Sequence, residues 1–600
     1  MQDYRKNFVA ALAILIFAAS LLSVRLWQLQ ILKGDEYESF SRHNRIRFVR
    51  VPAPRGRILD RNGKEFVRNR PSFDLYINLE YVVDAERLTI DLSRITSIPP
   101  EAIREKLDRA HTSSRFGSVL IAKDIGRDVL AQVEPRRSTT LRGVEIEVNH
   151  VRQYPNGSTG AQFLGYVGMV TEGELRENER FKKGDLVGKT GVEKEYERYL
   201  RGRDGVRQIA TDALGRVVDP YLFKEDFVNV DAVAGNDVVL TVDLDLQREA
   251  EAALGDKAGA VVVVEVGTGR ILALASSPSF NPDIFVTGIE EKEWKALLND
   301  KRSPMINRAT QGAYAPGSVF KIISAVGLLE EGVVDADTQF YCPGYYRIGS
   351  YVYRCWKRSG HGWVNLHRAL VESCDVYFYT AVEKLGIDRL SRYMGLFGLG
   401  RPTGIGIAER AGVSPNRRWK REVKGKPWYH GDTVLTAIGQ GYVGVTPLQI
   451  AMMTSAVANG GKMMKPLLVG SVVGHSGEVV DEFPPQTKYG LKLSASTLKQ
   501  LRSALVDAVN GPKGTGRAAR LRKVVVAGKT GTAQVVSNKS RLDVWEHNDH
   551  GWFTSYAPSD SPEIAVTVLV EHGGGGGKVA APIARRILEF YFKAKEGGEV

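Results

Sequence analysis

The sequence predicts an α+β protein with one N-terminal membrane-spanning helix, a mixed α/β module and a C-terminal α+β domain. Three observations predict this arrangement. Residues 8–24 form an uncharged run of 17 residues, FVAALAILIFAASLLSV. Residues 64 to about 230 alternate short strand-like runs with amphipathic helical stretches. Beyond residue 231, strand and helix patterns continue to about Tyr591, and 600 residues with 43% apolar content suffice for two or more globular domains.

The apolar run predicts a membrane anchor at residues 8–28, preceded by a cytoplasmic tail at residues 1–7. Arg5 and Lys6 lie before it, and Trp27 follows at the interfacial position. The alternative is a cleaved signal peptide with small residues at 18–20. The run continues past those residues to Val24, which favours an uncleaved anchor. Six arginines follow within residues 42–57, so the charge rule alone does not set the orientation.

The pattern behind the anchor predicts two domains, at residues 40–230 and 231–600. In the first, residues 73–77 are typical of a strand and residues 100–110 of a helix. In the second, we expect a strand at 238–244, a helix at 245–254 and a buried β-branched strand at 260–265. Gly267, Thr268 and Gly269 then predict a hairpin turn into a strand at 270–275.

The charge of the chain excludes little by itself. A net charge of +13 and a pI near 9.3 suit an anionic partner of any kind. No zinc finger, RNA-recognition signature or long basic block accompanies it, so we expect no nucleic-acid partner. Gly-Lys-Thr-Gly occurs twice, at 188–191 and 528–531. Neither copy completes a phosphate-binding loop, because residues 183 and 523 are lysine where that loop needs glycine.

Three short motifs carry the chemistry: Ser318-Val319-Phe320-Lys321, Ser373-Cys374-Asp375 and Lys529-Thr530-Gly531. Alone, the first is more simply a helix N-cap followed by a surface lysine. Together and in this order, the three supply a nucleophile, a base, a relay hydroxyl and an anion-binding strand. This is the inventory of a serine acyl-transferase that acts on a peptide with a free carboxylate.

Local patterns predict where each motif lies. Ser318 is expected to open an apolar helix that Gly332 closes, which places Lys321 on the face below the Ser318 hydroxyl. Ser373 is expected in a tight connection between two helices. Lys529 is expected after a strand at 524–528, with a second strand at 550–558 beside it. A glycine at 531 would let a substrate backbone approach closely.

The chain resembles the class B penicillin-binding proteins, most closely the elongation-specific branch of penicillin-binding protein 2. The resemblance spans nearly the whole chain and includes the anchor. Its motifs are Arg55–Gly63, Gly188–Glu193, Tyr314–Lys321, Gly439–Gly441 and Gly528–Ala533. The broader family usually has asparagine where this chain has Asp375. A carboxylate there resembles the elongation branch.

The resemblance implies a pedestal of the penicillin-binding protein dimerisation type at 40–230. It also implies a transpeptidase domain at 231–600, with an antiparallel sheet flanked by helices as in serine β-lactamases. Ser318 would form the acyl-enzyme, with Lys321, Ser373, Asp375 and Lys529 as further catalytic residues. Thr530, Gly531 and Thr532 would bind the substrate carboxylate, and β-lactams would acylate Ser318. The alternatives are a D,D-carboxypeptidase, a β-lactamase or a penicillin-recognising sensor that does not cross-link.

Partners and location follow from the same resemblance. The implied partners are peptidoglycan stem peptides, the membrane glycan polymerase of the elongation machinery and its scaffold proteins. The implied location is the cytoplasmic (inner) membrane, with the catalytic domain on the periplasmic or extracellular side. A bifunctional transglycosylase is not expected, because no glycosyltransferase-like region lies between residues 34 and 231.

The three cysteines, Cys342, Cys355 and Cys374, fall within 33 residues, with His361 among them. One interpretation is a Cys342–Cys355 disulfide with an inert Cys374. The other is a structural zinc site made by all four residues, which have the softness and number that zinc prefers. Some relatives in the elongation branch carry a metal at a corresponding place. No cofactor is expected for catalysis itself.

Overall fold

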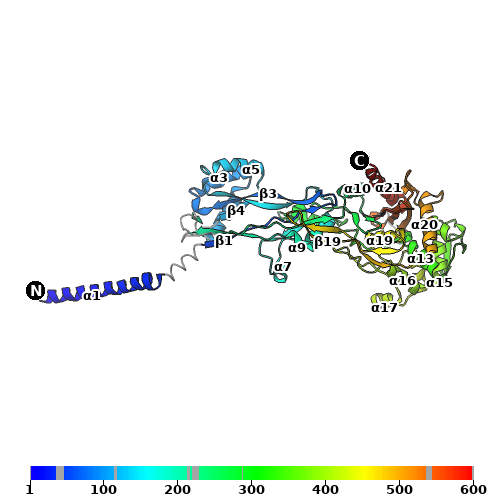
Figure 1. Ribbon diagram of the computed structural model, residues 1–600, viewed down its shortest axis with the longest axis horizontal. Coiled ribbons are helices and arrows are strands. Elements are labelled where there is room, and N and C mark those ends of the chain that lie inside the picture. The colour runs from blue at the N-terminus through cyan, green and yellow to red at the C-terminus, as the bar shows by residue number, and fades with distance from the viewer. Residues whose placement is uncertain are drawn as a thin grey trace. The chain divides into compact units, whose positions relative to one another are not determined.

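The computed structural model describes residues 2–34, 46–113, 118–211, 217–218, 229–286, 288–535 and 544–597 (Figure 1). The chain divides into two compact units, each assembled from separated stretches of sequence. The smaller contains Met1–Pro54, Arg70–Val151 and Gly202–Ala234. The larger contains Arg55–Asn69, Arg152–Arg201 and Gly235–Val600.

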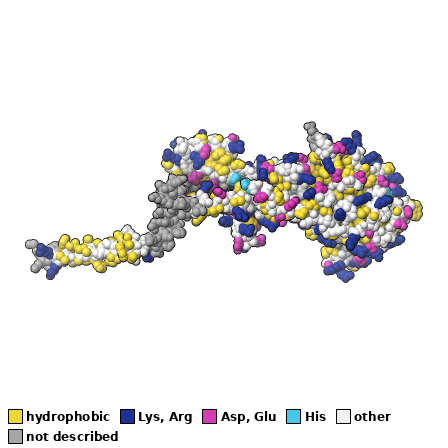
Figure 2. Space-filling view, viewed as in Figure 1, with side chains coloured by type: hydrophobic (Ala, Val, Ile, Leu, Met, Phe, Trp, Pro, Cys, Tyr) yellow, Lys and Arg dark blue, Asp and Glu magenta, His cyan; other side chains and the backbone are white. Residues whose placement is uncertain are grey.

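The N-terminal apolar run is helical. Helix α1 (Gln2–Trp27) continues into the π-helical turn η1 (Gln28–Leu32). Residues Arg5–Leu32 form a helix of 28 residues, longer than the about 20 that cross a bilayer core. Its hydrophobic side chains are exposed and cover its surface in Figure 2. It is the one helix in the described ranges that is long and apolar enough to span a membrane.

The smaller unit has its own hydrophobic core. The C-terminal half of strand β3 (Glu65–Asn78), which contains the predicted strand at 73–77, pairs with β4 (Ser118–Ala122) and with β5 (Val144–Gln153). Leu88 and Leu92 of α3 (Ala85–Thr96) and Ile103 of α4 (Pro100–Ser113) pack into the core. The remaining elements are α5 (Arg127–Val133) and the sheet of β1 (Ile46–Val51), β8 (Gly205–Thr211) and β9 (Val217–Val218).

A five-stranded antiparallel sheet forms the centre of the larger unit. Its strand order is β12-β11-β23-β22-β21. The strands are β11 (Gly259–Glu265), β12 (Ile271–Ser277), β21 (Ala527–Ala533), β22 (His550–Ala557) and β23 (Ile564–Val570). β11 and β12 confirm the predicted hairpin. The predicted strand at 550–558 corresponds to β22, which lies beside the edge strand β21.

Helices cover both faces of this sheet (Figure 1). Successive residues of a strand point to opposite faces, and β22 shows both environments. Phe553 packs into the hydrophobic core with α10 (Leu244–Leu254) and α21 (Gly576–Lys595). The next residue, Thr554, exchanges hydrogen bonds with Thr454 of α19 (Pro447–Ala458) and Thr567 of β23, at 2.6 and 2.7 Å. The sheet is therefore buried on both sides.

A second sheet of the larger unit joins β19 (Val479–Glu482), β18 (Val469–Val473), β10 (Asp237–Leu240), β2 (Ile58–Leu59) and the start of β3. The strand expected at 238–244 ends earlier, at Leu240. The cause is Asp243, whose carboxylate accepts hydrogen bonds from the backbone of Asp245 and Leu246 and so caps α10.

Among its described residues, the larger unit also contains further helices and four two-stranded sheets. The helices are α6 (Ala161–Leu164), α7 (Glu172–Glu177), α8 (Gly191–Glu195), α9 (Glu197–Leu200), α11 (Asp283–Val286), α12 (Glu291–Asn299), α16 (Ile387–Leu396), α17 (Arg417–Lys424), α18 (His430–Ala437) and α20 (Ala495–Asn510). The paired strands are β6 (Val167–Met169) with β7 (Leu186–Gly188), β13 (Phe340–Cys342) with β16 (Gly362–Val364), β14 (Tyr345–Ile348) with β15 (Tyr351–Arg354), and β17 (Lys462–Met464) with β20 (Thr487–Gly490).

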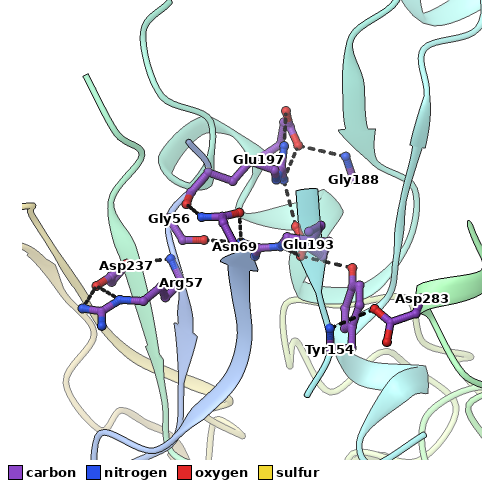
Figure 3. Close-up of polar contacts among 11 residues, drawn as sticks. Gly56, Arg57, Asn69, Tyr154, Gly188, Glu193, Glu197, Asp237 and Asp283 are labelled. Carbon is purple, nitrogen blue, oxygen red and sulfur yellow. Dashed lines mark hydrogen bonds and ion pairs between the residues drawn. The ribbon is translucent and has the colours of Figure 1, made fainter. Parts of the chain in front are cut away.

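A buried ion cluster joins the distant segments Arg55–Gly63, Arg152–Tyr154 and Gly188–Glu197 of the larger unit (Figure 3). Glu193 is fully buried and accepts hydrogen bonds from Arg152 at 2.6 Å, Arg55 at 2.8 Å and the Tyr154 hydroxyl at 3.3 Å. Burial opposes ionisation of Glu193, but the two guanidiniums hold its pKa below the ordinary value. The charged motifs at Arg55–Gly63 and Gly188–Glu193 therefore have a structural role: they hold these segments together.

Candidate active site

The first motif lies at the start of a buried helix. Residues Gly317–Phe320 form a 3-10 turn, η5, and α13 (Lys321–Glu330) continues it. The helix expected from Ser318 therefore begins with a tighter turn. Gly317 has a φ of +55°, and a Cβ there would lie 2.5 Å from the carbonyl oxygen of Thr532. Only glycine allows Ser318 to sit this close to the strand that carries the third motif.

The second motif occupies the predicted tight connection between α14 (Leu366–Val371) and α15 (Asp375–Leu385). Ser373 has a φ of +56°, a left-handed conformation that is uncommon for serine. The amide of Cys374 donates to the carbonyl of Ala369 at 2.9 Å and holds the turn. Strained residues of this kind persist where the surrounding structure fixes them, and they cluster at functional sites.

Lys321 joins the first two motifs. Its side chain is fully buried, and its Nζ donates to Asp375 Oδ1 at 2.7 Å, to the Ser373 carbonyl at 2.9 Å and to Ser373 Oγ at 3.3 Å. Burial raises the pKa of Asp375, and the charge of Lys321 opposes that rise. The structure describes no hydrogen-bond partner for the half-buried Ser318 hydroxyl, which faces the cleft.

The third motif lies within the edge strand β21, which begins at Ala527. The strand expected at 524–528 was therefore placed too early, and residues 529–533 belong to the strand itself. Lys529 is fully buried, and burial together with Lys321 lowers its pKa well below the ordinary value. Its Nζ donates to the Thr530 carbonyl at 3.2 Å, and no described carboxylate forms an ion pair with it.

The residues that follow Lys529 contact neighbouring segments of the chain. Thr530 donates to Thr515 Oγ1 at 2.7 Å, and Thr532 Oγ1 accepts from the amide of Gly576 at 3.4 Å. At Gly531, an added Cβ would lie 2.8 Å from the Pro316 carbonyl oxygen and 3.1 Å from a methyl of Val319. The glycine is thus required by the nucleophile segment of the protein, a reason that the sequence did not indicate.

A cleft of about 1050 Å³ collects these groups. Its lining includes Ser318, Ser373, Asp375 and residues Thr530–Thr532, while Lys321 and Lys529 are buried beside it. The lining also includes Gln440, from the family motif Gly439–Gly441, and residues that sequence reasoning missed: Trp356, Tyr379, Asp549 and Gly575–Lys578. The run of five glycines at 573–577 before α21 was the available signal for the last of these.

The Gly-Lys-Thr-Gly copy at residues 188–191 does not line this cleft. Lys189 forms an ion pair with Glu174 at 2.6 Å, and Gly188 donates to Glu197 at 2.9 Å in the buried ion cluster. The copy therefore has a structural role, and the same tetrapeptide performs different tasks at its two positions.

The cysteines and the histidine lie together beside the cleft. The ligand atoms of Cys342, Cys355, His361 and Cys374 are all within 4.8 Å of one another, and all four residues are buried. The cysteines are free thiols, so the disulfide interpretation is not met in this structure. His361 Nδ1 lies 3.6 Å from Cys342 Sγ and 3.5 Å from Cys355 Sγ. Hydrogen bonds from Cys374 and His361 lower the pKa of Cys342 to about 6, which favours the metal-binding thiolate.

Two hydrogen bonds connect this Cys/His cluster to Lys321. The amide of Asp375 donates to Cys355 Sγ at 3.5 Å, and the amide of Trp356 donates to Asp375 Oδ2 at 2.9 Å. Asp375 therefore stands between the cluster and the lysine that it pairs with. Anything that holds Cys355 and Cys374 in place therefore also holds the Asp375 carboxylate against Lys321.

Two family models match the chain. Residues 50–240 match the penicillin-binding protein dimerisation domain, and residues 259–589 match the penicillin-binding protein transpeptidase domain. Together they cover most of the chain, including the motifs at 318–321, 373–375 and 529–531.

Curated relatives match nearly the full length. A peptidoglycan D,D-transpeptidase MrdA from Acinetobacter baumannii is 35% identical over 99% of this chain and 88% of its own length. The protein of the same name from Escherichia coli (strain K12) is also 35% identical, over 98% of this chain and 93% of its own.

Solved structures show the same architecture. A Helicobacter pylori complex of PBP2 with MreC matches with a TM-score of 0.77 and 28% identity, over 92% of this chain and 99% of the matched chain. Pseudomonas aeruginosa PBP2 in complex with WCK 5153 matches with a TM-score of 0.68 and 31% identity, over 92% and 98%. A peptidoglycan synthase complex that coordinates polymerization and crosslinking matches with a TM-score of 0.73 and 32% identity, over 99% of both chains.

Proposed function

The chain belongs to the penicillin-binding proteins that combine a dimerisation domain with a transpeptidase domain, and from this premise we propose that it cross-links peptidoglycan during cell elongation. The observation that carries the proposal is the meeting of Ser318, Lys321, Ser373 and Lys529 at one cleft. The elongation role rests on the near full-length similarity to MrdA proteins and PBP2 structures.

The reaction proceeds through an ester on Ser318. The Ser318 Oγ gives up its proton and attacks the carbonyl between the two terminal D-alanines of a stem peptide. The peptide bond breaks, and the last D-alanine leaves as an amine that takes up a proton. An amine from a neighbouring stem peptide then attacks the ester, which forms the cross-link and returns the proton to Ser318.

Lys321 and Ser373 are placed to move the protons. Lys321 acts as the base for acylation, and Ser373 passes the proton to the leaving amine. The 3.3 Å distance from Lys321 Nζ to Ser373 Oγ gives the two groups direct contact. Asp375 holds the lysine in place at 2.7 Å, and Lys321 passes one of its protons to this carboxylate before it takes up the proton of Ser318. Neither group needs a metal or cofactor for this step.

The substrate carboxylate completes the charge balance of the cleft. Lys321 and Lys529 bring two buried amines, whereas Asp375 is the carboxylate paired with Lys321. A free C-terminal carboxylate, or that of a β-lactam, supplies the second anion beside Lys529, Thr530 and Thr532. Backbone N–H groups of Ser318 and Thr532 form the oxyanion hole.

Labelling with a fluorescent penicillin tests the nucleophile. The wild-type protein should become covalently labelled, and Ser318→Ala should lose the label because no ester can form. Persistent labelling of Ser318→Ala would refute the assignment. Cross-linking of glycan polymer supplied by a cognate polymerase then separates a transpeptidase from a carboxypeptidase, which releases D-alanine without forming cross-links.

We also propose that the Cys/His cluster binds a structural zinc ion. A tetrahedral zinc with Zn–S of about 2.3 Å and Zn–N of about 2.0 Å separates its sulfur and nitrogen ligands by about 3.5 Å. The distances from His361 Nδ1 to Cys342 and Cys355 agree with that spacing. Cys374 would supply the fourth ligand. When bound, the ion would supply rigidity, because it would fix Cys374 and Cys355, the residues directly before Asp375 and Trp356.

Metal analysis tests this site. Protein purified without chelator should contain one zinc ion per chain, and Cys374→Ser together with His361→Ala should release it. Chelation should lower the thermal midpoint of the wild-type protein and leave that of the double variant unchanged. A metal-free wild type, or a stoichiometric disulfide in the intact mass, would contradict the assignment.

The partners and the orientation are inferred from the relatives. The matched structures show PBP2 with MreC and a peptidoglycan synthase complex. We expect this chain to bind a scaffold protein and the glycan polymerase in the same way, with residues 1–7 in the cytoplasm and the catalytic domain outside. Co-purification of the polymerase with the full chain tests the first statement. Protease accessibility in spheroplasts tests the second.

A further inference from the structure

Residues 340–364 form an unusual surface module beside the active-site cleft. It consists of the strand pairs β13–β16 and β14–β15, and it carries the cluster residues Cys342, Cys355 and His361. Eight of its 25 residues are aromatic, against 9% of the whole chain. It also contains four cationic residues, Arg347, Arg354, Lys357 and Arg358, and no aspartate or glutamate.

Most of the aromatic side chains of this module are exposed. Tyr341, Tyr345, Tyr351, Trp356 and Trp363 are 47–72% exposed, whereas exposed aromatic residues normally occur singly. Tyr341 and Trp363 are cross-strand partners with ring centroids 5.6 Å apart. No carboxylate of the described residues forms an ion pair with any of the four cations. Rings and unpaired cations on one rigid module are typical of a binding surface.

The outward side of β14–β15 mixes the two kinds of side chain. Cross-strand partners share a face, and the pairs Tyr345↔Arg354 and Arg347↔Val352 place a phenol ring, two guanidiniums and an apolar side chain together. All four residues are exposed, and Arg354 and Val352 also line the cleft. The opposite face, with Tyr346 and Tyr353, packs against Tyr379 of α15.

This surface is continuous with the catalytic cleft. Val352, Arg354, Trp356 and Arg358 line the same cleft as Ser318. The reacting peptide of the proposed substrate is attached to a long glycan, so the rest of that polymer must leave the cleft across its rim. Sugar rings stack their C–H faces on aromatic rings, and peptide carboxylates pair with guanidiniums. The module offers both types of partner at the rim.

We propose that the exposed side of the 340–364 module, centred on Tyr345, Arg354 and Arg358, binds a segment of the polymeric substrate, sugar rings that carry anionic peptides. The proposal deepens and rests on the proposed transpeptidase function. The module holds the polymer while Ser318 reacts with one of its peptides. The Cys/His cluster keeps the module rigid, so the contact surface costs little conformational entropy on binding.

The test measures binding without turnover. The parent is full-length Ser318→Ala protein, and the probe is soluble uncross-linked peptidoglycan strands. Arg354→Gln with Arg358→Gln should weaken strand binding by about tenfold and reduce its salt dependence, because two charge-assisted contacts are lost. Tyr345→Ala should weaken binding of strands by about threefold and leave binding of the sugar-free stem peptide unchanged.

The matched control is Arg520→Gln with Arg522→Gln, which removes two exposed arginines that do not line the cleft. Its affinity should stay within about twofold of the parent. Equal affinities of parent and module variants would overturn the proposal and leave a protein partner as the occupant. An equal loss in the control would overturn it as non-specific charge attraction. Penicillin labelling of the chain with Ser318 intact reports the proposed function separately.

Discussion

Lys321 and Lys529 are both fully buried, and among the described residues Asp375 forms an ion pair with Lys321 whereas no carboxylate forms one with Lys529. A buried cation without a partner anion is costly, and the usual response is a lowered pKa. The pKa of Lys529 is lowered in this way. Under the proposed function, the carboxylate of the substrate supplies the anion that Lys529 lacks among the described residues.

This charge balance predicts a pH dependence. Burial and Lys321 lower the pKa of Lys529 below the ordinary 10.5, so its positive charge is lost at a lower pH than in free lysine. Acylation by an anionic penicillin should fall by about 10- to 100-fold as the pH rises through that lowered pKa. The second-order acylation rate measured from acidic pH up to pH 10.5 checks this. A neutral penicillin ester should lack the decline. The same decline for acid and ester would show that another group causes it.

The sequence predicted which side chains gather at the cleft but not their backbone partners. Ser318, Lys321, Ser373 and Lys529 could be named because each combines a distinctive side chain with a fixed spacing. The amide of Trp356, which holds Asp375, could not be named. An amide is the same in every residue except proline, so its role depends on the fold and leaves no signature in composition or spacing.

At the scale of elements, the close approach of η5 to β21 assembles the site. Gly317 and Gly531 face each other's segments, and each would collide with backbone or core atoms if it carried a Cβ. The structure thus uses glycine to bring two elements together, whereas the sequence pattern indicated helix punctuation at 317 and substrate access at 531.

Gly317→Ala should separate η5 from β21. A Cβ would lie 2.5 Å from the Thr532 carbonyl oxygen, so Ser318 must shift, and penicillin acylation should fall by about 100-fold or more. Gly332→Ala is the matched control, because its φ of +63° is similar but no atom lies within 4 Å of the added Cβ. It should cost about 1 kcal/mol of stability and keep its acylation rate. Equal rates in the two variants would show that the φ angle alone is responsible.

Element boundaries were the weaker part of the sequence prediction. The helices at 100–110 and 245–254 and the hairpin at 260–275 are present, since hydrophobic periodicity is strong there. The sequence predicts the third motif after a strand, whereas in the structure the motif lies within β21. Its Lys-Thr-Gly-Thr sequence lacks the β-branched pattern of 524–526, yet pairing with β22 makes it a strand. Tertiary pairing overrides local propensity at such an edge.

At the scale of the whole molecule, the two compact units do not follow the order of the chain. Residues 55–69 and 152–201 belong to the unit that contains the candidate active site, although they lie far from its three motifs in sequence. Arg55, Arg152 and Glu193 hold these returning segments together in the buried ion cluster (Figure 3). Sequence reasoning found the motifs at 55–63 and 188–193 but could not pair them, because nothing in their spacing encodes a contact over 138 residues.

Removing one charge from this cluster should destabilise the larger unit. Glu193→Gln leaves Arg55 and Arg152 buried without their shared anion, which should lower the free energy of unfolding by about 3 kcal/mol. The pKa of Glu193 is below the ordinary 4.5, so its stabilising contribution is complete above about pH 4.5 and is lost as the pH falls toward the folded pKa. The difference in thermal midpoint between wild type and variant should therefore shrink on acidification.

Glu174→Gln, which breaks the partly exposed pair with Lys189, should cost at most about 1 kcal/mol. Equal losses in the two variants would contradict a structural role for the buried cluster.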